Sequence, residues 1–211
     1  FDILGYVVSV VSGRSLAEFI EEEICVPLHM KDTTFFLSEE QKPRLVDVYK
    51  RKNNQLIKVT GTKDDMAGFM HEKEICFEHG CGGLFSTLDD YANFGEMLLG
   101  NGNFRGGQLL KPETVELMHT EAPMQHLEPE PGFVWGLGMK IRQDPKKANV
   151  SATEGTYGWS GAFGTHFLIS PKDDLEVVFM MNRSDIGGSG SYISAKVEEL
   201  VFGIWGKDKN E

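Results

Sequence analysis

The feature of this chain that most constrains its fold is a change in hydrophobic period. Apolar residues recur at helical spacing through much of residues 1–130, whereas short apolar runs at strand spacing dominate residues 131–211. Spacings of three to four residues line one face of a helix, and strict alternation lines one face of a strand. Helices followed by strands with hairpin-length connections are typical of an α+β fold. We therefore expect one partial domain, with a helical and loop lobe over 1–130 and an antiparallel sheet plus a closing helix over 131–211.

The helical lobe is expected to begin with two short helices. An apolar stripe runs through residues 2–12 and stops at Gly13, a residue type that commonly ends helices. Ser15 and Glu18 have capping-box spacing, which predicts a second helix that Pro27 ends. The same reasoning predicts further helices at about 87–99, 112–119 and 191–205. Helices are thus available to cover both faces of the sheet.

Three strands are predicted in the second part of the chain, at 133–141, 162–170 and 175–181. Residues 133–141 alternate strictly, which is the period of a half-buried strand. PKDD at 171–174 indicates a tight turn. The strand at 175–181 is apolar on both faces, so we expect it to lie inside the sheet. Between about 30 and 85 the periodicity is weak, and polar clusters such as KRKNNQ at 50–55 look like loops and short extended pieces.

Charge and composition argue against several classes of function. The 211 residues include 21 Lys and Arg against 32 Asp and Glu, so the net charge is −11, which disfavours nucleic acid and anionic lipid as partners. The longest apolar runs fall far short of the roughly 18 residues that a membrane-spanning helix needs. Cys25, Cys76 and Cys81 form an odd, sparse set, so at most one disulfide is expected. The chain opens at FDILG, inside a helical pattern and without an initiator Met, and reads as the later part of a longer protein.

The densest cluster of small residues is GTYGWSGAFGT at 155–165, which leads into a predicted strand. Glycines at such a place let a ligand or another backbone approach the chain closely. The same composition is also common where a loop enters a bulged strand. Composition alone leaves both interpretations open.

Several motifs in a fixed order resemble one protein family. They are GCGGLFSTLDDYANFGEMLLG (80–100), LLKPETVELM (109–118), VWGLGM (134–139) and YGWSGAFGTHFLISPKDDLEVVFMMN (157–182). This order resembles the C-terminal part of the serine β-lactamase-like hydrolases, the group of class C β-lactamases, penicillin-binding proteins and family VIII-type carboxylesterases. The opening segment is similar to that family too, with His29 where it usually has Gly. The resemblance implies a β-lactamase/transpeptidase-like fold, an antiparallel sheet flanked by helices with a helical lobe, whose N-terminal strands are missing here.

The resemblance also implies a set of site residues. Trp159-Ser160-Gly161 matches the position of Lys-Thr-Gly in β-lactamases and of Trp-x-Gly in many esterase-like members. By that match the backbone N–H of Ala162 is one oxyanion donor, and Tyr157, Trp159, Ser160 and Gly161 bind substrate, Ser160 through its hydroxyl. Trp159 in place of Lys removes a cation, which disfavours β-lactam turnover and favours an ester, amide or D-amino-acid peptide.

The nucleophile of that family, the Ser of a Ser-x-x-Lys motif, has no match in this chain. Thr60 and Lys63 have the spacing but lie in a polar loop sequence. Tyr91-Ala-Asn93 matches the family's Tyr-x-Asn literally, yet Tyr91 belongs to the apolar stripe of a predicted helix and is expected in the core. The resemblance therefore implies that the nucleophile and its Lys lie upstream of Phe1, and that this chain alone is catalytically incomplete.

Histidines and cysteines offer a rival interpretation of a different class. His71, Cys76, His79 and Cys81 lie close together in sequence and are residue types that bind zinc, although their spacing matches no usual finger pattern. The alternative is that they are loop residues with partly buried thiols. The remaining histidines with no evident Ser or Cys partner, which we expect to be surface or packed residues, are His119, His126 and His166.

The sequence thus predicts the C-terminal portion of a serine hydrolase that acts through an acyl-enzyme on an ester, amide, D-amino-acid peptide or β-lactam, without cofactor or metal. The alternatives are a non-catalytic ligand-binding protein of the same fold and, third, a zinc-binding module. Besides a small-molecule substrate, the expected partner is the protein's own N-terminal part or a strand-exchanged copy, because strand 175–181 would have an unpaired edge. The compartment stays open between cytoplasmic and periplasmic or secreted.

Overall fold

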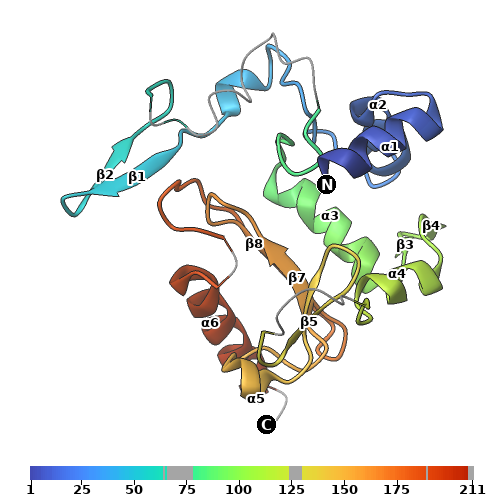
Figure 1. Ribbon diagram of the computed structural model, residues 1–211, viewed down its shortest axis with the longest axis vertical. Helices are drawn as coiled ribbons and strands as arrows, with labels where there is room; N and C mark the ends of the chain where they lie inside the picture. The colour runs from blue at the N-terminus through green and yellow to red at the C-terminus, as the bar shows by residue number, and fades with distance from the viewer. Residues whose placement is uncertain (64, 66–77, 124–129, 189, 209–211) are drawn as a thin grey trace. The chain divides into compact units, whose positions relative to one another are not determined.

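The computed structural model describes residues 1–63, 65, 78–123, 130–188 and 190–208 (Figure 1). The chain forms two compact units, one made of Phe1–Asn93 with Asn182–Ser184 and the other of Phe94–Met181 with Asp185–Glu211. Within the described ranges, no single helix is long and apolar enough to cross a membrane. One bent helix pair, Asp2–Ser12 with Leu16–Cys25, meets the length and composition criteria together.

The first unit begins with the two predicted helices. Helix α1 (Asp2–Ser12) ends at Gly13, which takes a left-handed conformation with φ 71°. Helix α2 (Leu16–Ile20) starts at a complete capping box, in which Ser15 and Glu18 satisfy each other's backbone amides. A π-helical turn (Glu21–Cys25) continues it. The two helices predicted from the sequence are confirmed, and they meet at a bend of 81°.

A β-hairpin occupies a stretch in which the sequence predicts loops and short extended pieces. Strands β1 (Tyr49–Lys52) and β2 (Gln55–Lys58) pair antiparallel. The two connecting residues, Asn53 and Asn54, both have positive φ, at 51° and 65°. Asparagine tolerates this conformation better than most residues, and a two-residue turn of this kind matches the twist of the strands it joins. A short 3₁₀ turn (Lys42–Arg44) precedes the hairpin.

Helix α3 (Leu88–Leu99) lies where the sequence predicts a helix. Its first residues belong to the first unit and the rest, from Phe94 on, to the second. Thr87 caps it, because its hydroxyl accepts the backbone N–H of Asp90 at 3.2 Å. The short strands β3 (Asn103–Phe104) and β4 (Gly107–Gln108) follow as a small hairpin. The two short helices of the second unit are α4 (Pro112–Met118) and α5 (Pro145–Ala148).

A five-stranded antiparallel sheet forms the centre of the second unit (Figure 1). Its strands follow the chain order, with each strand paired to the next. They are β5 (Phe133–Trp135), β6 (Lys140–Arg142), β7 (Tyr157–Ser160), β8 (His166–Ser170) and β9 (Leu175–Phe179). The predicted turn at 171–174 joins β8 to β9.

The sequence prediction of one strand at 133–141 is wrong, because this segment is two strands folded back on each other. Val134 pairs with Ile141 across the hairpin, and the Gly136 amide donates to the Met139 carbonyl at 2.8 Å to close it. Gly138 takes φ 78°, a conformation that most L-residues avoid. A Cβ atom at Gly136 would overlap the Met118 carbonyl oxygen. Glycines therefore turn the chain where a continuous alternation suggested a straight strand.

Two further strand predictions need correction. Strand β8 starts at His166 rather than at residue 162, because residues 161–165 form the loop of the β7–β8 hairpin, closed by the Gly161 amide donating to Thr165 at 2.9 Å. Strand β9 ends at Phe179 rather than at residue 181, and it lies at the edge of the described sheet, as expected for this chain without the strands that would complete the sheet. The apolar pattern on both faces of this strand predicted burial, but no described strand pairs with its outer edge.

Helices cover both faces of the sheet, as the sequence predicts. Helix α6 (Tyr192–Asp208) packs on one face, where Phe202 joins Leu168 and Val177 in a buried cluster. On the other face the C-terminal half of α3 packs against β8, with the rings of Phe94 and Phe167 6.2 Å apart. The sheet is therefore held between two helical layers, and this arrangement leaves its strand edges as the places where backbone groups remain accessible.

We predict opposite effects for two glycine substitutions. Gly136→Ala should destabilise the second unit by about 1–3 kcal/mol, because the new methyl group would overlap backbone. Gly203→Ala is the control, since its Cβ meets nothing within 4 Å in helix α6, and it should stabilise by up to about 1 kcal/mol. Thermal unfolding of both variants measures this. Equal changes in Tm would contradict the assigned hairpin geometry.

Candidate active-site edge

Strand β7 carries the glycine-rich motif and is paired on only part of its length. Toward β6, only Tyr157 and Gly158 have partners, Ile141 and Lys140. Toward β8, pairing continues through Trp159 to Ser160. Strand β6 begins only at Lys140, because the residues before it form the Gly136–Met139 turn and lead away from β7. Residues 159–162 therefore have one backbone edge with no strand partner among the described residues, and we call this the open edge.

The direction of the backbone groups along the open edge follows from the hairpin. The Gly161 amide donates to the Thr165 carbonyl in β7's partner segment. Neighbouring residues of a strand turn their N–H and C=O groups to opposite sides. The amides of Ser160 and Ala162 consequently face the open edge. Ala162 is exposed, and no hydrogen bond between described residues uses its N–H.

Two tryptophans stand beside the open edge. Trp159 remains 43% exposed, which is unusual for so large a residue on a central strand. Its ring centre lies 4.7 Å from that of Trp135 on β5, at a tilt of 53°. Contacts of this kind hold an aromatic ring in place while leaving one surface free. The pair forms an apolar wall that a ligand at the edge could touch.

Tyr157 and Ser160, both predicted to bind substrate, have buried side chains in this structure. The Tyr157 ring stacks on His119 at 4.7 Å between ring centres, and burial raises the pKa of its hydroxyl. The Ser160 hydroxyl makes a 2.7 Å hydrogen bond with Nδ1 of His166, directly across the hairpin. What Ser160 presents to the open edge is backbone rather than its hydroxyl.

A row of buried polar side chains continues inward from Ser160. Nε2 of His166 lies 3.1 Å from a carboxylate oxygen of Glu198 on α6, and the same oxygen pairs with the guanidinium of Arg142 on β6. All four side chains are buried. The approach of Nε2 to the carboxylate lacks hydrogen-bond geometry, and the direction of the bond between Ser160 and Nδ1 depends on the tautomer of the histidine. We call Ser160, His166, Glu198 and Arg142 the buried row.

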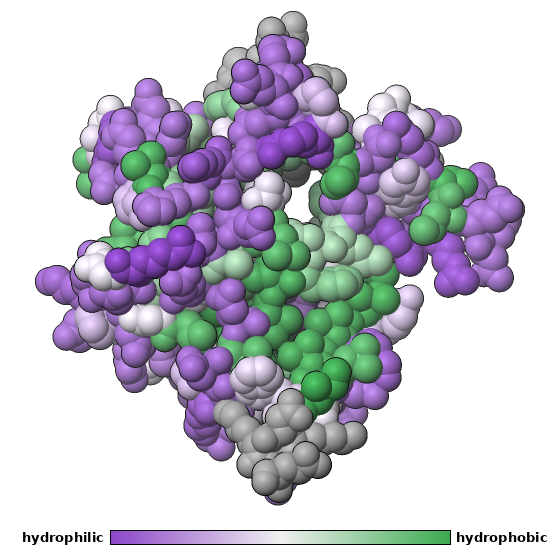
Figure 2. Space-filling view, turned by 180° about the vertical axis from the view of Figure 1, so that it is seen from behind, coloured by the Kyte–Doolittle hydropathy of each residue, from purple (hydrophilic) through white to green (hydrophobic). Residues whose placement is uncertain are grey.

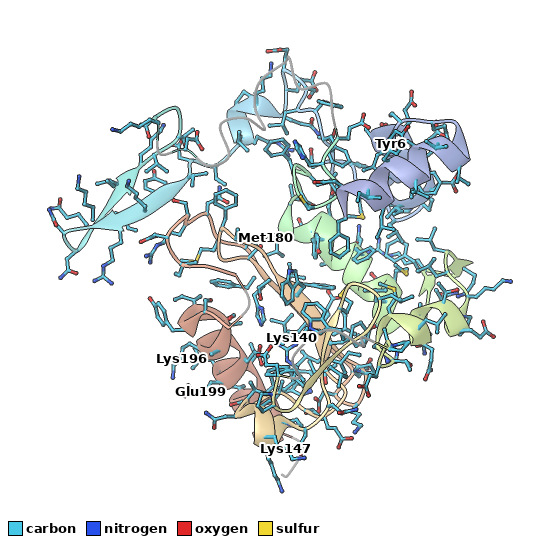
Figure 3. All side chains as sticks on the ribbon, viewed as in Figure 1. Tyr6, Lys140, Lys147, Met180, Lys196 and Glu199 are labelled. Carbon is cyan, nitrogen blue, oxygen red and sulfur yellow. The ribbon has the colours of Figure 1, made fainter. Side chains whose placement is uncertain are left out.

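The charge state of the buried row follows from its contacts. Burial raises the pKa of Glu198, but the neighbouring His166 and Arg142 outweigh that effect, so the pKa lies below its ordinary value. The carboxylate is therefore ionised at neutral pH and balances the guanidinium. A second buried cation, Lys140 (labelled in Figure 3), pairs with Glu130 at 2.6 Å and lies over the Phe133 ring. Charges behind the open edge are thus paired.

The other residues singled out from the sequence lie elsewhere. Thr60 and Lys63 are in turns after β2, and the Thr60 hydroxyl accepts the Val48 amide at 2.7 Å. Tyr91 lies in α3, where burial raises the pKa of its hydroxyl. His79 and Cys81 belong to the first unit. The residues that fall outside the described parts of the chain are His71, Cys76 and His126.

Sequence reasoning missed the partners of two histidines. His166 was expected to be an isolated histidine, yet the hairpin pairs it with Ser160, and a symmetric turn about residues 161–165 would have indicated that pairing. His119 was also expected to be isolated, and it stacks on Tyr157. The contributions of Arg142 and Glu198 carry no sequence signal, because they come from segments far apart in the chain.

A family model described as Beta-lactamase matches residues 1–200. The chain therefore belongs to the Beta-lactamase family, as the motif order at 80–182 indicated. Its relatives include hydrolases, acyltransferases, a peptidase and an amidase. The expected β-lactamase/transpeptidase-like fold is confirmed by the antiparallel sheet between helical layers and by the structural likenesses given below.

Two curated relatives illustrate the extent of the match. Protein Rv1367c of Mycobacterium tuberculosis (strain ATCC 25618 / H37Rv) is 31% identical over 193 residues, which cover 86% of this chain and 47% of that protein. A putative D-alanyl-D-alanine carboxypeptidase of Escherichia coli (strain K12) is 25% identical over 200 residues, covering 86% and 43%. The chain spans about half the length of the curated relatives it matches.

Solved structures show the same likeness in three dimensions. EstCE1, described as a hydrolase with promiscuous acyltransferase activity, has a TM-score of 0.80 at 21% identity over 95% of this chain and 54% of that one. The LovD6 mutant of simvastatin synthase from Aspergillus terreus has a TM-score of 0.78 at 24% identity over 98% and 54%. At such identities the likeness establishes fold, and activity has to be argued from the site.

We predict that the buried row contributes pH-dependent stability. Glu198→Gln should destabilise the protein by about 3 kcal/mol at pH 7, because Arg142 would be left buried without its counter-ion. The pKa of Glu198 is lowered by folding, so its contribution is full above the ordinary glutamate pKa and is lost as the pH falls through the folded value. Denaturant unfolding of both proteins between pH 7 and 3 should show the difference shrinking. A difference that is constant with pH would contradict the assignment.

Proposed function

We propose that this chain provides the oxyanion edge and part of the substrate pocket of a serine hydrolase that acts through an acyl-enzyme. The observation that carries the proposal is the open edge, where the amide of the exposed Ala162 has no strand partner within the described sheet and lies beside an exposed tryptophan. Preorganised amides of this kind stabilise the negative charge that develops on a carbonyl oxygen during acyl transfer. Membership of the Beta-lactamase family supports the same class of reaction.

The mechanism assigns one role to this chain and another to the rest of the protein. A serine followed three residues later by Lys, in a part of the protein outside this chain, adds to the substrate carbonyl, and the Lys accepts the serine proton. The Ala162 N–H and the amide of that serine stabilise the oxyanion. The bond to the leaving group then breaks, the leaving group takes the proton, and water hydrolyses the acyl-enzyme.

The open edge favours an uncharged or extended acyl group over a β-lactam carboxylate. Trp159 takes the first position of the motif and offers an apolar wall with Trp135 instead of a cation. The Ser160 hydroxyl, which could otherwise bind a carboxylate, is engaged with His166 on the α6 side. The substrate class we propose is therefore an ester, amide or D-amino-acid peptide whose acyl chain lies along residues 159–162.

A second candidate is a non-catalytic ligand-binding protein that keeps the pocket and lacks the chemistry. A fluorophosphonate probe, which labels activated serines covalently, separates the two when it is applied to the full-length protein. Labelling that mass spectrometry maps to a Ser-x-x-Lys motif supports the hydrolase. An unlabelled protein that still binds a short ester without turnover supports the binding protein.

The sharpest test of the open edge is Ala162→Pro in the full-length protein. Ala162 is the second residue of the Gly161–Gly164 turn, which the Gly164 amide closes at 3.0 Å, and proline is favoured at that position. The substitution therefore removes the N–H with little cost to the fold. Acylation by an activated ester should fall about 10²–10³-fold, the usual effect of losing one oxyanion donor.

Ala162→Ser is the matched control for this test, because it keeps the backbone N–H. It should retain most of the acylation rate, and both variants should unfold at nearly the same temperature as the parent. An unchanged acylation rate in Ala162→Pro would remove Ala162 from the oxyanion site.

We also propose that the outer edge of β9 pairs with strands from the rest of the protein. Val177 is buried and its four neighbours in β9 are half-buried, although β9 is an edge strand of the described sheet. Exposed apolar side chains of the same unit include Met180, Leu200 and Ile204, and Figure 2 shows a broad apolar area on one face. Unpaired edges with apolar surroundings associate readily.

The expected result is that these 211 residues, made alone, form aggregates or strand-exchanged oligomers, whereas addition of the N-terminal part of the same protein yields a defined one-to-one complex. Size-exclusion chromatography with light scattering measures both. A monodisperse monomer with two-state unfolding from this chain alone would contradict the proposal.

A further inference from the structure

Three side chains of different metal-binding types meet in the first unit, away from the residues of the open edge. Asp2, His79 and Cys81 bring a carboxylate, an imidazole and a thiol together, with one ligand atom from each lying within 4.8 Å of the others. Asp2 and His79 are partly buried, and Cys81 is an exposed free thiol. The residues are close in space although 77 or more positions separate Asp2 from the other two (79 − 2 = 77).

The local backbone holds this cluster together. His79, Gly80 and Cys81 belong to a turn in which the Gly82 amide donates to the His79 carbonyl at 3.3 Å. Gly80 sits against the first turn of α1 so closely that a Cβ atom there would overlap the Phe1 carbonyl. The glycine therefore allows the two flanking side chains to reach Asp2. The segment before α3 and the start of α1 lie side by side in Figure 1.

One carboxylate oxygen of Asp2 is already oriented by the protein. Oδ1 accepts the backbone N–H of Cys81 at 3.1 Å, and Oδ2 lies 3.5 Å from the Cys81 sulfur. The amide hydrogen bond to Oδ1 fixes the carboxylate, which is how proteins orient carboxylates around metal ions. Oδ2 accepts a hydrogen bond from the Cys81 thiol, and this oxygen becomes available to a metal ion when the thiol loses its proton on binding the same ion. Nδ1 of His79 faces the same carboxylate at 4.0 Å.

The distances suit a tetrahedral zinc ion. Zinc bonds of about 2.0–2.3 Å to oxygen, nitrogen and sulfur place the ligand atoms of a tetrahedron about 3.3–3.7 Å apart. The sulfur–oxygen distance of 3.5 Å already lies in this range. Nδ1 of His79 lies 4.0 Å from the other carboxylate oxygen, Oδ1, and the three ligand atoms lie within 4.8 Å of one another. The imidazole therefore has to move toward the other two ligands by up to about 1.5 Å, which rotation of a partly exposed side chain allows.

The ligand chemistry selects the type of metal. A thiolate and an imidazole favour zinc and similar transition metals over magnesium and calcium, which prefer oxygen alone. We propose that Asp2, His79 and Cys81 form a three-residue site for zinc or a chemically similar divalent ion. Three protein ligands leave a fourth position for water or an external ligand. The site differs from the set His71, Cys76, His79 and Cys81 considered from the sequence, because Asp2 is a member and no finger pattern is needed.

Cobalt(II) is the probe for this site, since it replaces zinc and gives an intense ultraviolet absorption when bound to thiolate. The metal-free full-length protein under reducing conditions should bind one equivalent of Co²⁺ with such a band, and Zn²⁺ should displace it. Cys81→Ser should abolish the band. Asp2→Asn and His79→Gln should weaken Co²⁺ binding by at least about 10-fold, the effect expected even for residues that only support ligands.

Cys25→Ser is the matched control, because Cys25 is a free thiol of the same unit that is buried and has a pKa raised by burial to about 11. This variant should keep the band and the affinity. Circular dichroism establishes that each variant is folded before titration. No band in the parent protein, a band that survives in Cys81→Ser, or one that depends on Cys76 and not on Cys81 would overturn the proposal. The result is independent of whether the protein hydrolyses any ester.

Discussion

The arrangement of the second unit depends on the hydrogen-bonded ladder between β7 and β8. The bond from the Gly161 amide to Thr165 fixes which backbone groups of the hairpin turn toward β8, and so decides that Ser160 and Ala162 turn outward. A shift of one residue in this register would exchange the two sets of amides and move Trp159 into the opposite face. The geometry of the candidate site is therefore set first by strand pairing and only then by its side chains.

The short length of β6 beside β7 is the second condition for an accessible edge. Strand β6 pairs with only two residues of β7, because the chain turns at Gly136 and Gly138 rather than running on beside Trp159. A longer β6 would satisfy the same amides and close the edge. Buried backbone donors in a sheet are nearly always paired, whereas the amide of the exposed Ala162, just beyond the end of β7, has no strand partner among the described residues. Here a tight glycine turn in one strand creates that situation in its neighbour.

Local patterns predicted much of the fold and less of the site. Capping signals and apolar stripes located α1, α3 and α6, since these depend on neighbouring residues. Alternation over 133–141 predicted one strand with Phe133 and Ile141 on the same face, whereas the fold-back pairs Ile141 with Val134 and so places it on the opposite face. Only the glycines marked the fold-back. The apolar run in β9 indicated burial, which in this chain alone is incomplete.

The site residues divide in the same way. The motif at 159–162 was found through its order among other motifs, and the hairpin symmetry that joins Ser160 to His166 was visible in principle. Arg142, Glu198 and Asp2 could not be found, because their contacts form between segments that are distant in the chain and follow no local period. Contacts of this kind are decided by tertiary packing, and a single sequence has no local pattern that predicts them.

The buried row has a consequence for how such a protein can change over generations. Its four members come from β6, β7, β8 and α6, and each makes a hydrogen bond or an ion pair with another member in the interior. Replacing any one of them leaves another buried without its partner, whereas replacing several together by apolar residues of similar volume costs little folding free energy. Substitutions at positions 142, 160, 166 and 198 should therefore occur together in diverging descendants. The face of the sheet behind the open edge should change by several substitutions at once rather than by single ones.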